Sequence, residues 1–77
     1  MLPEEDARVG RIAEALRSYL RAHPMAADSL EGITQWWLPG DLIVTAAQVE
    51  AALDRLLAEG EATSRTVAGG VRVYSRS

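Results

Sequence analysis

The sequence predicts an α+β fold, in which a three-helix core is followed by a C-terminal two-stranded β-hairpin. Three observations carry this prediction: three stretches with the apolar spacing of amphipathic helices, capping-box patterns that open the second and third stretch, and a Gly-Gly pair near the end of the chain. A length of 77 residues fits one small domain, and we assign residues 1–77 to it.

Residues 4–22 are predicted to form the first helix. Pro3 fits the first helical position, and the acidic residues 4–6 complement the positive end of the helix dipole. The pattern ends at His23-Pro24, because proline disfavours helical geometry in the residue before it. The predicted buried stripe consists of Val9, Ile12, Ala13, Leu16, Tyr19 and Leu20.

A second helix is predicted after a short extended link at residues 25–27. It begins at Ser29, with Asp28 as its cap and Glu31 reaching back to that cap. Its apolar face would comprise Leu30, Ile33, Thr34 and Trp37. Trp36 would lie at the edge of this face, and the segment Leu38-Pro39-Gly40 stops the helix.

The third helix is predicted over residues 46–59. Thr45 and Gln48 form its capping box, and Gly60 ends it. Its buried stripe would be Val49, Ala52, Leu53, Leu56 and Leu57. The preceding residues 41–44 are β-prone and too short for a helix, so they form either a connector or a short strand against the hairpin.

The hairpin over residues 61–76 is predicted to turn at Gly69-Gly70, since tight hairpin turns need positive φ angles. A two-residue loop would put Val71 and Val73 on the inner face. It would also gather Arg65, Arg72, Tyr74 and Arg76 on the outer face. A three-residue loop would move Arg65 to the other side, and the sequence leaves both registers open.

The run VEAALDRLLAEGEATSRTVAGGVRVY resembles the third helix and wing of winged helix-turn-helix domains, and Leu56-Leu57-Ala58-Glu59-Gly60 resembles the stop before their first wing strand. In the DNA-binding members, the third helix enters the major groove and the wing contacts phosphates or the minor groove. The resemblance therefore implies, as one alternative, a DNA-binding transcriptional regulator. Its nucleic-acid contacts would be Arg55, Arg65, Arg72, Tyr74 and Arg76.

Charge argues against a groove-reading third helix. Residues 22–60 carry six acids and one arginine, a local charge of −5, whereas residues 61–77 carry a local charge of +2. Glu50, Asp54 and Glu59 are predicted on the exposed side of the third helix, beside Arg55 alone. Because phosphate neutralisation supplies most non-specific DNA affinity, nucleic acid is possible as a partner but disfavoured. The arginines of the hairpin alternatively form a solvated strand face with a contact between Arg65 and Tyr74.

We therefore predict a protein-interaction module that associates with itself or with a partner in a larger assembly. Trp36 lies beside the buried stripe, next to an apolar connector, and exposed tryptophans are frequent interface anchors. The alternative is that the connector folds back and covers Trp36. The predicted partner-binding residues are Trp36, Leu38, Leu42, Ile43, Glu50 and Asp54.

The sequence carries no signature of catalysis. It contains no cysteine, and its Gly-Gly pair precedes a strand rather than the helix that a phosphate-binding loop requires. Glu50 and Asp54 are four residues apart and would suit acid-base chemistry or a weak metal site, but we interpret them as a solvated pair. We predict no enzyme, cofactor or metal. The acidic N-terminus and the lack of a long apolar stretch predict a cytoplasmic protein without a membrane partner.

Overall fold

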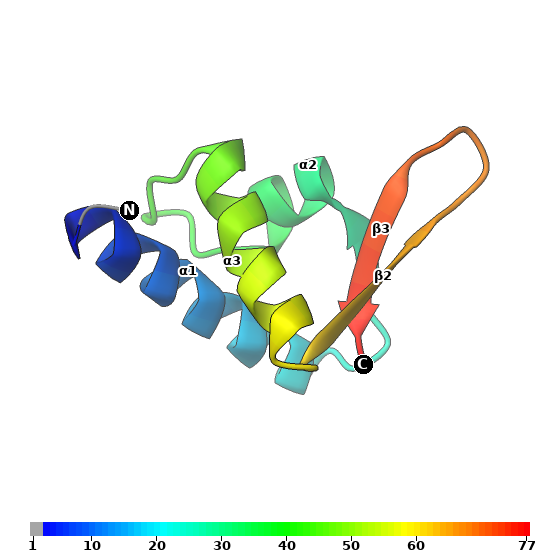
Figure 1. Cartoon of the computed structure of the whole chain (residues 1–77), viewed down its shortest axis with the longest axis horizontal. Coiled ribbons are helices and arrows are strands. Elements are labelled where there is room, and N and C mark those ends of the chain that lie inside the picture. The colour runs from blue at the N-terminus through cyan, green and yellow to red at the C-terminus, as the bar shows by residue number, and fades with distance from the viewer. Residues whose placement is uncertain (1–2) are drawn as a thin grey trace.

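The computed structural model describes residues 3–77, in which three helical segments pack with a three-stranded antiparallel sheet (Figure 1). The elements in chain order are α1 (Pro3–Ala22), β1 (Ala27–Ser29), α2 (Leu30–Gly32) continuing as the π-helical turn η1 (Ile33–Trp37), α3 (Ala46–Ala58), β2 (Ala62–Thr66) and β3 (Arg72–Arg76). The predicted α+β class is confirmed, with one strand more than predicted. Met1 and Leu2, which belong to the predicted domain, lie outside the described residues.

The core lies between α1 and α3, which pack side by side, and the sheet (Figure 1). Its buried members are Val9, Ile12, Ala13, Leu16, Leu20, Ile33, Trp37, Val49, Ala52, Leu53, Leu56, Ala62 and Tyr74. The stripes predicted for the first and third helices are therefore confirmed almost completely. Tyr19 and Leu57 are half-buried and pack against this core from its margin.

The start of α3 is fixed by the predicted capping box. The N–H of Gln48 donates to Thr45 Oγ1 (3.1 Å), and the N–H of Thr45 donates to Gln48 Oε1 (3.0 Å). Two of the N–H groups that a helix start leaves unpaired thus find acceptors within one turn.

The cap of the second helix differs from the prediction. Ser29 is the N-cap, and its Oγ accepts a hydrogen bond from the N–H of Gly32 (3.3 Å). The carboxylate of Asp28 instead accepts from the N–H of Ser29 (2.8 Å) and lies against Gly32. A Cβ at residue 32 would stand 2.1 Å from Asp28 Oδ1, so glycine leaves room for this carboxylate.

A third strand forms where the sequence predicted only a link. β1 pairs with β3 in antiparallel register, with Ala27 opposite Ser75 and Ser29 opposite Val73, so the strand order is β1-β3-β2. The strand alternative for residues 41–44 is wrong, because these residues have no regular structure and the free edge of β3 is taken by β1.

The hairpin takes the three-residue loop rather than the two-residue loop. The N–H of Val67 donates to the carbonyl of Val71 (2.8 Å), and Gly69 and Gly70 both have positive φ (87° and 79°). Arg65 consequently lies opposite Val73. Tyr74 faces the core and is 3% exposed, so the predicted inner face of Val71 and Val73 is wrong. The slip of one residue moves the side chains of β2 to the other face relative to β3, and it therefore takes Arg65 away from the Tyr74 side.

Candidate interaction surfaces

The two adjacent tryptophans have opposite environments. Trp37 is 6% exposed and stacks on Tyr19 with ring centroids 4.7 Å apart, whereas Trp36 is 74% exposed. Neighbouring residues of a helical turn point in different directions, so a segment that buries Trp37 turns Trp36 outward. The core position predicted for Trp37 is confirmed. The alternative that the connector covers Trp36 is wrong.

The apolar residues of the connector between η1 and α3 also differ in exposure. Leu38 and Leu42 are half-buried against the core, but Ile43 is 82% exposed. Of the four apolar residues predicted to bind a partner, Trp36 and Ile43 therefore present most of their side chain to solvent. Leu38 and Leu42 mainly hold the connector to the core.

Ile43 adjoins two arginines of α1. A shallow depression of about 220 Å³ is lined by Arg8, Arg11, Asp41, Leu42 and Ile43, which we call the basic face. Arg8 and Arg11 are three residues apart and therefore lie on one side of α1. Within residues 3–77, the structure gives neither arginine an ion pair.

A second depression separates the helices from the hairpin. This acidic groove has a volume of about 460 Å³, and its lining includes Leu30, Glu31, Glu50, Val71, Arg72 and Tyr74. Both carboxylates are exposed, and neither has an ion pair among the residues that the structure describes. The guanidinium of Arg72 donates to Ser64 Oγ (3.0 Å) and lies 5.1 Å from the centre of the Tyr74 ring. Arg72 is thus already held by a hydroxyl and by an aromatic face.

The arginines predicted for DNA contact do not share one surface. Arg72 and Arg76 lie on the Tyr74 side of the hairpin, whereas Arg65 lies on the opposite side. Arg55 points toward α1 and pairs with Asp6. The predicted outer face of Arg65, Arg72, Tyr74 and Arg76 is therefore wrong, and the partner of the Tyr74 ring is Arg72 rather than Arg65.

A separate ionic cluster fastens α1 to the segment that leaves α3. Arg17 Nη2 binds Glu59 Oε1 and Arg17 Nε binds Glu61 Oε2, each at 2.5 Å, and Arg17 Nη1 lies 3.3 Å from Glu14 Oε2. Hydrogen bonds to Glu59 and Glu61 raise the pKa of the Arg17 guanidinium above its ordinary value. The two carboxylates therefore favour the charged form that an arginine already has at physiological pH.

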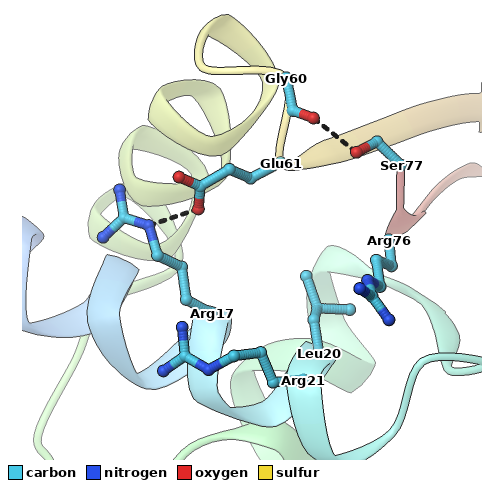
Figure 2. Close-up of a pocket in the computed structure, with 7 residues that line it drawn as sticks. All are labelled: Arg17, Leu20, Arg21, Gly60, Glu61, Arg76 and Ser77. Carbon is cyan, nitrogen blue, oxygen red and sulfur yellow. Dashed lines mark hydrogen bonds and ion pairs between the residues drawn. The ribbon is translucent and has the colours of Figure 1, made fainter.

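The pocket beside this cluster has a volume of about 300 Å³ (Figure 2). Figure 2 shows Arg17 joined to Glu61 on one side, Arg21 and Leu20 below, and Arg76 and Ser77 across the opening. Ser77 Oγ donates to the carbonyl of Gly60 (2.5 Å), which closes the end of the hairpin onto the turn after α3. Glu14, Glu59 and Glu61 offset the charge of the surrounding arginines, so the pocket is a poor site for an anion.

Glu50 and Asp54 are both exposed on α3, as predicted. Residues 3–77 contain no group of three or more His, Cys, Asp or Glu side chains that could hold a metal ion. In the same residues, no helix combines the length and the apolar character needed to cross a membrane.

Three of these features were not predicted from the sequence. Arg8 and Arg11 could have been found from their spacing on the polar side of α1. Glu31 was interpreted only as part of a cap, and Arg17 only as one charge among balanced charges. Their neighbours come from distant parts of the chain, and no local pattern reports them.

In comparisons with known proteins, no family model, no curated protein and no solved structure matches this chain.

Proposed function

We propose that this chain is a winged-helix-type domain that works as a protein-interaction module. The hairpin that follows α3, and the packing of α1 and α3 beneath it, correspond to the layout on which the resemblance rests. Because a fold does not determine a function, the choice between protein and DNA depends on surface chemistry.

The observation that carries the proposal is the exposure of Trp36. An indole that is 74% exposed leaves a large apolar surface in water, although Trp37 beside it is buried. Tryptophan is the residue type most enriched among interface anchors, where its removal typically costs about 2 kcal/mol or more of binding energy. Trp36 is therefore the residue through which we expect a partner to dock.

The charge of α3 supports a protein partner over DNA. Its exposed side carries Glu50 and Asp54, which repel phosphate. The arginines of the hairpin are split between two faces, so they provide no continuous basic strip along which a duplex would lie.

A crosslinking experiment tests the proposal directly. A photoreactive amino acid replaces the exposed residue Gln35 in the cell, in chains that keep Trp36 or carry Trp36→Ala. We expect a discrete protein adduct only in the chain that keeps Trp36. The thermal melt of Trp36→Ala, followed by circular dichroism, should match that of the parent. Met25→Ala is the matched control, because Met25 is also highly exposed but lies outside η1. Adducts that persist in Trp36→Ala, or no adduct at all, would contradict the proposal.

A DNA titration tests the competing function. Fluorescently labelled duplexes of varied sequence are titrated with the protein at about 0.05 M and about 0.2 M salt. We expect weak binding that disappears at the higher salt. Tight, sequence-selective binding that survives it would replace the protein-interaction proposal with a regulator of transcription.

A further inference from the structure

The acidic groove and the basic face have complementary compositions. The groove offers two carboxylates, Glu31 and Glu50, and one guanidinium, Arg72. The basic face offers two guanidiniums, Arg8 and Arg11, and one carboxylate, Asp41. Each charge of one surface thus has an opposite counterpart on the other.

The apolar parts of the two surfaces match as well. Ile43 projects from the basic face with 82% of its surface exposed, and Val71 in the groove is 47% exposed. Leu30 and the buried Tyr74 extend the apolar lining of the groove. The basic face thus presents an isoleucine flanked by cations, and the groove presents solvent-open apolar side chains flanked by anions.

One chain cannot bring these surfaces together. The start of α1 and the connector before α3 lie toward one end of the molecule, and the hairpin lies toward the other (Figure 1). The long dimension of the chain is 36 Å, against 25 and 24 Å for the others. The two surfaces consequently stay apart in a monomer. A second copy carries the counterpart of each surface, so its basic face can meet the groove of the first copy.

We propose that this chain associates head to tail with a second copy of itself, the basic face of one copy entering the acidic groove of the next. Ile43 inserts against Val71 and Leu30, while Arg8 and Arg11 face Glu31 and Glu50. Asp41 then faces Arg72. The contact is heterologous, so every open complex leaves one groove and one basic face free, and association continues beyond the dimer until it closes into a ring or stays open as a filament.

This inference rests on the proposed function only in that the chain is an interaction module. The residues of the head-to-tail contact do not include Trp36, which leaves that side chain for another partner. The two ideas can therefore fail separately.

Sedimentation velocity of the purified chain gives the first test. Over a concentration range from about 10 µM to about 1 mM, we expect the weight-average mass to rise with concentration, and to rise less at about 0.5 M salt. A chain that stays monomeric over the whole range at low salt would overturn the inference.

Two variants then test the direction of the contact. The groove variant carries Glu31→Arg and Glu50→Arg and keeps its basic face. The face variant carries Arg8→Gln, Arg11→Gln and Ile43→Gln and keeps its groove. Each alone should self-associate at least roughly tenfold more weakly than the parent, because each has lost one side of the head-to-tail contact. An equimolar mixture retains one intact pair of surfaces, so it should form a heterodimer that stops at two chains.

The controls separate this contact from others. Arg65→Gln with Arg76→Gln removes two exposed arginines elsewhere and should leave self-association unchanged. Thermal melts followed by circular dichroism check that each variant is folded. The head-to-tail contact would be refuted if the mixture of the groove and face variants had no higher weight-average mass than each variant alone. It would also be refuted if either variant self-associated as strongly as the parent. Loss of association in Trp36→Ala alone would assign the self-contact to Trp36, and the proposed function would stand without this inference.

Discussion

Replacing Leu53 with alanine should lower the free energy of unfolding by about 2 to 5 kcal/mol, the range measured for truncated core leucines. Leu53 is 0% exposed and belongs to the cluster between α1 and α3. The change removes apolar surface from the core and leaves a cavity that two packed helices fill only in part. A chain of 77 residues has a total stability of about 4 to 12 kcal/mol, so the loss is a large fraction of it.

Leu57→Ala provides the matched control. The same atoms are removed from the same helix, but Leu57 is only half-buried. Burying a whole leucine side chain contributes about 1.5 to 3 kcal/mol, so truncation of Leu57 should cost about 1 kcal/mol. Urea titrations followed by circular dichroism measure both differences, and the melting temperature of Leu53→Ala should fall by roughly 8 to 40 °C. Equal midpoints for the two variants would show that the inner face of α3 is wrongly assigned.

Three further substitutions test the α3 cap, the hairpin turn and the ion pairs of Arg17. Thr45→Ala should cost about 1 kcal/mol in urea titrations because the start of α3 loses its cap, and Thr45→Ser should restore most of it. Gly69→Ala should lower the melting temperature, since a side chain at φ 87° costs about 1 to 2 kcal/mol, whereas Ala68→Gly should have a small effect. Arg17→Met should destabilise the chain by up to about 1 kcal/mol at low salt and by less at about 1 M salt, because salt screens partly exposed ion pairs.

Local signals were sufficient to predict α1 and α3, whereas the second helix, predicted with Asp28 as its cap, is a short α-helical turn capped by Ser29 that continues as a π-helical turn. The stripe on α1, the Thr45 capping box and the glycine turn each act over a few residues, so they can be read without knowing the partner surfaces. The first strand is different. Ala27, Asp28 and Ser29 have no alternation and no β-branched residue, and they are extended in a strand because β3 presents an unpaired edge to them.

The face of β2 that lies on the Tyr74 side depends on a single residue of loop length. Val71 and Val73 are apolar and were therefore assigned to the core, but Tyr74 carries a larger apolar surface and takes that place. The turn sequence permits both loop lengths, and the three-residue loop puts the buried Ala62 on the Tyr74 side of the hairpin. The acidic groove depends on which side of β3 meets the core, since Arg72 and Tyr74 alternate on the same side of that strand and both line the groove.

The local charges read from the sequence do not describe the charges that a partner meets. Arg17 is neutralised by Glu59 and Glu61, and Arg55 pairs with Asp6, so neither adds to a basic surface. The arginines of the basic face instead come from α1, although the charges of residues 1–21 are balanced overall. Contacts between this face and the acidic groove involve exposed charges, and about 0.1 M salt already screens such charges beyond about 10 Å.

A contact through Trp36 has the opposite response to salt. Burial of an indole is driven by the removal of apolar surface from water, and salt weakens it little or strengthens it. Salt therefore distinguishes the two surfaces without any mutation. Association that falls steeply with salt belongs to the charged surfaces, and association that survives belongs to Trp36. If the chain uses both contacts, the groove and face variants should lose only the salt-sensitive association. Trp36→Ala should lose only the association that survives salt.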